Sequence, residues 1–99
     1  MRMIKELVHR LDEEIEDAKE YAEKYVEYKA KGNMPRANKY KEMATDELKH
    51  SNYIHEMAVH EIDEIKKVYA APVEMQEKWD MEHKAYVEKV AWIKQMLTL

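Results

Sequence analysis

Apolar residues recur along this chain at intervals of three and four positions, which is the spacing of residues on one face of an α-helix. On a helical wheel of about 100° per residue, one apolar stripe runs from residue 4 to residue 26 and a second runs from residue 40 to residue 65. A third set, between residues 75 and 97, is interrupted by polar side chains. The pattern predicts an all-α protein with three amphipathic helices.

Gly and Pro residues mark the breaks between these helices. Gly32 stands where a helix C-terminus favours glycine, Pro35 suits the first turn of the next helix, and Pro72 ends the helix before it. We therefore expect helices at about 3–30, 35–70 and 73–97. The 99 residues form a single domain in this interpretation, and a domain of this size gains stability by oligomerising.

Composition and charge narrow the choice of partners and of compartment. The 17 Lys and Arg residues are interspersed among 21 Asp and Glu residues, for a net charge of -4, which argues against nucleic acid as a partner. The N-terminus reaches charged residues at once, so we expect neither a signal peptide nor a membrane span, and the predicted location is cytoplasmic. Because the chain has no Cys, a bound metal would need oxygen and imidazole ligands.

Three metal-ligating residues fall within the apolar stripes: Glu14 in the first, and Glu47 and His50 in the second. Counting outward from a turn near residue 32 or 33 puts Glu14 level with about residue 51, within roughly one helical turn of the other two. Buried carboxylates are costly unless they are paired or bound to a cation. A Glu from one helix and a Glu-x-x-His from its neighbour are ligands of two-metal carboxylate sites in helical bundles. Glu14, Glu47 and His50 are therefore the candidate metal ligands and catalytic residues.

The chain carries only half of such a ligand set. At the level of Glu14 the third helix is expected to present Ala91 and Trp92, which are not metal ligands. A two-fold axis beside Glu47 would bring a second Glu14 and a second Glu47 and His50, so that two metal ions share four Glu and two His. We therefore expect a homodimer or a higher even oligomer, with the chain itself as its partner.

Two segments resemble the ferritin-like superfamily, which includes rubrerythrins, bacterioferritins and the small encapsulated ferritins. The segment from Glu14 to Tyr21 is similar to the first-helix Glu with a Tyr seven positions on, and the segment from Asp46 to His50 is similar to the second-helix Glu-x-x-His. The chain looks most like the short ferritin-like proteins of bacterial and bacteriophage genomes. Four-helix members carry a second Glu and a second Glu-x-x-His, which this chain lacks. In the encapsulated ferritins, two short chains complete one iron centre between them.

The resemblance implies a ferritin-like helical hairpin with an added third helix, assembled into a bundle by homodimerisation. It also implies a di-iron site that oxidises Fe(II) with dioxygen or peroxide, which is an oxidoreductase activity of the ferroxidase type. In that site Glu14 would be a terminal ligand, Glu47 a bridging ligand and His50 a terminal nitrogen donor. Manganese or zinc would also suit this mixture of carboxylate and imidazole ligands.

Two other functions stay open. The first is a structural or adaptor bundle that dimerises through the same stripe and keeps a structural or vestigial metal. The second is a metal-free interaction module whose polar core sets the choice of partner. The sequence alone does not distinguish these from a metal-dependent oxidase.

Several further side chains have more than one interpretation. Glu61, Glu82 and His83, with His60 or His9, form either a second metal cluster or a hydrogen-bonded polar network. The alternative role of His50 and His55 is to hydrogen-bond to carboxylates at the edge of the core, and for His55 this is the expectation. Tyr21, one helical repeat from Glu14, is the first choice as a hydrogen-bond partner of a ligand. Met residues on the second stripe, at positions 43 and 57, are expected to fill the core.

Overall fold

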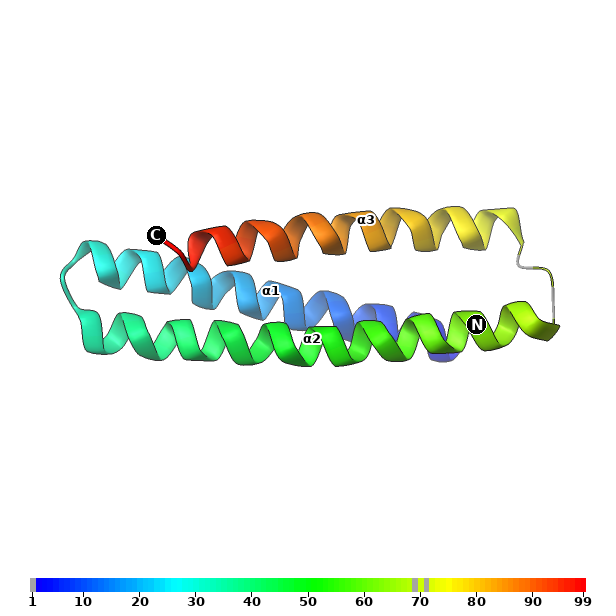
Figure 1. Cartoon of the computed structure of the whole chain (residues 1–99), viewed down its shortest axis with the longest axis horizontal. Helices are drawn as coiled ribbons and strands as arrows, with labels where there is room; N and C mark the ends of the chain where they lie inside the picture. The colour runs from blue at the N-terminus through cyan, green and yellow to red at the C-terminus, as the bar shows by residue number, and fades with distance from the viewer. Residues whose placement is uncertain (1, 69, 71) are drawn as a thin grey trace.

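The computed structural model is a rod of three helices: α1 (Arg2–Ala30), α2 (Met34–Val68) and α3 (Val73–Met96). It describes residues 2–68, 70 and 72–99, and within these ranges the protein has no β-strand. Figure 1 shows the helices side by side, with α2 running antiparallel to α1 and α3, and the rod measures 55 × 17 × 16 Å. The prediction of an all-α fold with three helices is confirmed.

The helix ends lie close to the predicted ones, with one difference at the end of α2. This helix stops at Val68 rather than at residue 70, and Ala70 is not helical. Residue 69 of the predicted helix lies outside the described residues. The α3 helix ends at Met96, and Leu97 caps it.

The turn between α1 and α2 follows from Gly32 and Asn33. Gly32 has a φ of +77°, a conformation that glycine adopts without strain. The Asn33 N–H donates to the Tyr28 carbonyl at 2.9 Å and the Gly32 N–H to the Lys29 carbonyl at 3.0 Å, which closes the C-terminus of α1 in a Schellman motif. The Asn33 side-chain oxygen accepts the Arg36 N–H at 3.2 Å and caps α2. This short, well-capped turn fixes how α1 and α2 align.

Small residues form the seam between α1 and α2. The fully buried positions on α2 recur every seven residues, and two alanines on α1 are equally buried; the set is Ala18, Ala22, Ala37, Ala44, Ser51 and Ala58. A seven-residue repeat keeps one stripe of a helix against its neighbour. Small side chains in such a stripe let two helix backbones approach closely. The seam therefore draws residues beside it, Glu47 among them, towards the opposite helix.

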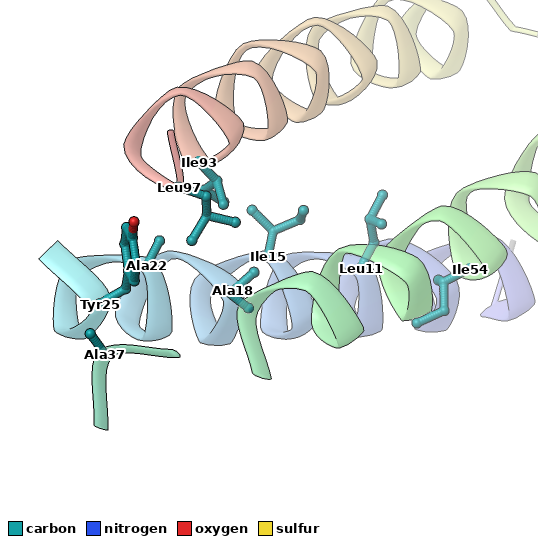
Figure 2. Packing of buried hydrophobic residues seen from close by; sticks show 10 residues of the cluster. Leu11, Ile15, Ala18, Ala22, Tyr25, Ala37, Ile54, Ile93 and Leu97 are labelled. Atoms are coloured by element: carbon teal, nitrogen blue, oxygen red, sulfur yellow. The ribbon is translucent and has the colours of Figure 1, made fainter. Parts of the chain in front are cut away.

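The α3 helix is fastened mainly at its C-terminal end. Ile93 is fully buried and Leu97 is 8% exposed, and Figure 2 shows both side chains pointing from α3 towards α1. The Lys29 amine also donates a hydrogen bond to the carbonyl of Leu99. Met75 and Trp79, which belong to the apolar set expected between residues 75 and 97 and lie nearer the start of α3, are only half-buried.

The α3 helix packs against α1 and meets α2 in few places. Between α2 and α3 runs an open groove of about 640 Å³. Apolar and aromatic side chains make up most of its lining, and each of the two helices contributes one lysine or more. The lining residues are Thr45, Leu48, Lys49, Asn52, Tyr53, Tyr86, Val87, Val90, Ala91 and Lys94. The α1–α2 hairpin is therefore the more extensively packed part of the fold, and α3 is an addition to one of its faces.

The alignment of α3 differs from the prediction by about one helical turn. Lys89 lies 3.9 Å from Glu16, and Trp92 stacks under the Lys19 amine at 5.4 Å. Glu14 is therefore level with about Val87, and the expectation that Ala91 and Trp92 lie at its height was wrong. A turn count from the sequence assumed an ideal connection between the second and third helices, and the positions of Lys89 and Trp92 beside α1 show a different alignment.

Two methionines of α2 lie at the surface. Met43 and Met57 were predicted to fill the core, but they are 41% and 50% exposed. Both lie on α2, on the flank of the stripe that α1 does not cover.

No helix in the described ranges combines the length and the apolar composition that are needed to cross a bilayer.

We predict that Ile93→Ala lowers the free energy of unfolding by about 2–4 kcal/mol, because it leaves a cavity where α3 is fastened to α1. Urea unfolding followed by circular dichroism measures this. Val87→Ala on the same helix is the matched control, since Val87 is 50% exposed and its truncation should cost well under 1 kcal/mol. Equal losses in the two variants would contradict this description of how α3 is attached.

Candidate metal centre

Glu14, Glu47 and His50 meet at the middle of the α1–α2 hairpin. Each offers a ligand atom, and these atoms lie within 4.8 Å of one another. The His50 Nδ1 is 3.7 Å from a Glu47 carboxylate oxygen and 3.9 Å from a Glu14 carboxylate oxygen. The structure therefore brings together all three residues that the sequence singled out, from two helices. In the described part of the chain no other group of three His, Asp or Glu side chains converges in this way.

The three side chains differ in their exposure. Glu14 is 17% exposed and Glu47 is 20% exposed, whereas His50 is 57% exposed. The helical wheel places His50 toward one flank of the apolar stripe and Glu47 at its middle, and in the structure His50 lies at the rim of the site. The reason is its place on the wheel, about 60° round the helix from Glu47 and away from α1. The site thus has a carboxylate floor and an imidazole at its opening.

One oxygen of the floor is unpartnered. Glu47 Oε2 is buried and has no hydrogen-bond partner among the described residues. Buried polar atoms in proteins are nearly always hydrogen-bonded, and an exception calls for a physical reason such as a missing proton, water or ion. The described residues therefore leave part of the hydrogen-bonding capacity of the Glu47 carboxyl group unused.

The electrostatics of the site centre on Glu47. Burial first of all, together with hydrogen bonding to Glu14 and the negative charges of Glu14, Asp17 and Asp46, raises the pKa of Glu47 from the ordinary 4.5 to about 7. Two carboxylates that share a small space cannot both ionise without repulsion, so one of them holds a proton. A cation bound between them would remove the repulsion and release that proton.

The sequence interpretation missed three charged neighbours. Asp17 and Asp46 contribute to the raised pKa of Glu47, and the Arg10 guanidinium lies 3.7 Å from Glu14. Arg10 is four residues before Glu14, a spacing at which helical side chains of opposite charge pair, so the sequence did contain this signal. Arg10 is 69% exposed and can swing away from the carboxylate.

Tyrosines extend from the site towards the α1–α2 turn. The ring centroid of Tyr21 is 6.2 Å from that of Tyr40, and Tyr40 stacks on Tyr28 at 5.6 Å. Burial and the negative charges of Asp17 and Glu47 raise the pKa of Tyr21, so its phenol stays protonated at neutral pH. In the part of the chain that the structure describes, Tyr21 makes no hydrogen bond to a candidate ligand, contrary to the expectation.

The other candidates lie elsewhere. His55 was expected to pair with a carboxylate, but its Nε2 is 2.9 Å from Nδ1 of His83 instead. Glu82 lies on the wall of a separate pocket of about 370 Å³ between the N-terminal parts of α1 and α3. Glu61 and Glu82 do not converge with His83 on a second cluster within the described residues.

The donor set suits a divalent metal ion. The ligand atoms of one ion with bonds of about 2.1 Å lie roughly 3–4 Å apart, so the distances of 3.7 and 3.9 Å need only side-chain rotation to reach this arrangement. Carboxylates and one imidazole suit iron, manganese or zinc, and the unpartnered Glu47 oxygen is placed to be a ligand. The residues therefore fit a metal ion.

The face of the hairpin that carries the site is not the face that α3 covers. On α1 the residues beside α3 include Glu16 and Lys19, and on α2 the ring of His55 stacks on Tyr86 of α3. Neither Glu14 nor Glu47 is among these residues. The site therefore lies at an open face of the hairpin.

Comparisons with known proteins find no relative. No protein-family model, no curated protein and no solved structure matches this chain.

We predict that the metal-free protein loses stability as the pH rises. A carboxyl whose pKa is raised in the folded state stabilises that state at low pH, and this contribution is lost between the ordinary pKa of 4.5 and the folded value of about 7. The free energy of unfolding should fall by up to roughly 3 kcal/mol across this window. Glu47→Gln, which cannot ionise, should not show this fall.

Urea unfolding with a chelator present, at pH 5 and pH 8, measures the difference. Glu23→Gln is the matched control, because Glu23 is exposed on α1 and should leave the wild-type fall unchanged. Parallel pH profiles for the wild type and Glu47→Gln would show that Glu47 does not carry the shared proton.

Proposed function

We propose that Glu14, Glu47 and His50 form half of a two-metal carboxylate centre of the ferritin-like kind, and that a second copy of the chain supplies the other half. The proposed activity is the oxidation of Fe(II). Glu14 and His50 serve as terminal ligands, and Glu47 serves as the bridging ligand. Manganese or zinc are the alternative occupants, since they accept the same donors.

The observation that carries this proposal is the environment of Glu47. Its carboxylate lies beside that of Glu14, one of its oxygens is buried without a hydrogen-bond partner among the described residues, and its pKa is raised to about 7. A purely structural role would be served as well by an apolar residue, because an unsatisfied buried carboxyl costs stability. A bound cation offsets this cost, and that favours a metal ligand.

The proposed reaction takes ferrous ions as its substrate. Two ferrous ions lose one electron each, and dioxygen takes up both electrons with two protons to give hydrogen peroxide. When peroxide is the oxidant, it takes two electrons and two protons to give two water molecules. Carboxylate ligands favour the harder ferric ion, so the site supports the oxidised product.

The residues of the chain have separate tasks in this proposal. Glu47 gives up its shared proton when the cation arrives, which couples metal binding to pH. His50 stands at the rim, where it is 57% exposed and accessible to an incoming ion. Arg10 partly neutralises Glu14 in the empty site and moves aside, which its exposure allows.

An exposed apolar surface beside the site suits contact with a second copy of the chain. Met43 and Met57 lie before and after Glu47 on α2, on the flank facing away from α3, and they are 41% and 50% exposed. A second hairpin placed on this face by a two-fold axis would bury these methionines. It would also bring its own Glu14, Glu47 and His50 beside the first set, because the axis passes next to Glu47.

Metal content of the wild type and Glu47→Ala tests the proposal. After anaerobic loading with Fe(II) and desalting, the wild type should retain about one iron per chain in an even oligomer, and the variant should retain none. Oxygen consumption should follow the same pattern. Glu42→Ala is the matched control, since Glu42 is an exposed carboxylate on the same helix.

The alternatives give different results. An intact oligomer that loses both iron and oxygen consumption in Glu47→Ala supports the chemistry. Loss of the oligomer together with the metal, with no oxygen consumption in the wild type, supports a structural ion. A wild type that retains no metal, and that Glu47→Leu stabilises, contradicts the proposal and supports a metal-free interaction module.

A further inference from the structure

A pair of histidine side chains joins α2 to α3, away from the carboxylate site. The Nε2 of His55 and the Nδ1 of His83 lie 2.9 Å apart, with ring centroids 5.0 Å apart and planes 28° apart. The two nitrogens therefore face each other almost in the plane of both rings. One of them donates a proton and the other accepts it, so a single proton lies between two lone-pair positions.

Aromatic side chains hold the pair in place. The His55 ring stacks on Tyr86 at 4.5 Å with planes 10° apart, and Trp79 lies 5.9 Å from His55 and 6.0 Å from His83. His55 is half-buried and His83 is exposed. The pair is thus fixed on one side by rings and open to water on the other.

We propose that His55 and His83 chelate a borderline divalent cation, of which Zn²⁺ and Ni²⁺ are the best examples, and that this ion clasps α3 to α2. Two imidazole ligands without a carboxylate select such ions over iron. Bonds of about 2.0–2.1 Å at a tetrahedral angle put the two nitrogens about 3.3 Å apart. The two nitrogens need to separate by about 0.4 Å, and each ring must turn by roughly 35° so that its lone pair points at the ion rather than at the other ring. The cation then replaces the shared proton.

The surroundings of His55 favour the neutral imidazole that a cation needs. Burial and the charge of His83 lower the pKa of His55, and Glu56 opposes this shift. Water completes the coordination, because His83 lies at the surface. The α2–α3 contacts are otherwise few, so an ion that bridges the two helices binds the folded chain better than the unfolded chain and stabilises it.

Trp79 provides a reporter for this site. The chain has two Trp residues, and Trp92 lies against Lys19, so Trp92→Phe leaves Trp79 as the only indole. In this background, with Glu47→Ala added to remove the carboxylate site, Ni²⁺ should quench the Trp79 fluorescence in a saturable way. Excess Zn²⁺, which does not quench, should restore the signal by competition. This test does not depend on the proposed iron chemistry.

His83→Gln and His55→Gln are the deciding variants, since Gln keeps a hydrogen-bonding side chain but has no imidazole. Each should weaken the apparent Ni²⁺ affinity at least tenfold while circular dichroism shows unchanged helix content. His60→Ala, an exposed His on α2, should leave the affinity unchanged. Unchanged quenching in either Gln variant, or equal loss in His60→Ala, would overturn the proposal. A variant that loses helix content is replaced by His83→Asn, to which the same criteria apply.

Discussion

The close packing of α1 against α2 is the constraint on which the rest of this structure depends. Alanines and one serine, all fully buried, line the seam at seven-residue intervals on α2 and let the two backbones come together. Glu47 lies between Ala44 and Ser51 in this seam and is forced against Glu14. Larger side chains in the seam would hold the helices apart and reduce the repulsion between the two carboxylates. The same packing that stabilises the hairpin therefore creates the charge conflict at its centre, and a bound cation resolves such a conflict.

The hairpin and its three inward polar residues could be predicted because short-range rules determine them. Gly32 and Asn33 fix a tight turn, and a helix rises about 1.5 Å per residue, so a count outward from this turn places Glu14 beside Glu47 and His50. The apolar period of each helix gave the buried stripe on α1 and most of that on α2. A predicted turn and the rise per residue give the relative heights of residues on two antiparallel helices. These heights are sufficient to locate the three ligands that one chain contributes.

The features that could not be predicted depend on the third helix and on side-chain reach. The alignment of α3 was wrong by about one turn, because the α2–α3 connection carries no signal of its geometry, and this hid the contact between His55 and His83. A wheel put His50 toward the flank of the stripe, but it does not show how far neighbouring side chains cover a residue, so the extent of its exposure was not predicted. The start of α3 is only half-buried because Ile93 and Leu97 attach this helix to α1 near its other end. The interrupted apolar pattern of α3 does not show which end is attached.

Anomalous diffraction from crystals of the iron-loaded protein is the most direct test of a metal centre shared between two chains. We expect two iron peaks roughly 3.5–4 Å apart, related by a two-fold axis, with Glu14, Glu47 and His50 of both copies as ligands. A single ion bound within one chain, or a dimer that leaves the Glu47 face exposed, would contradict a shared centre.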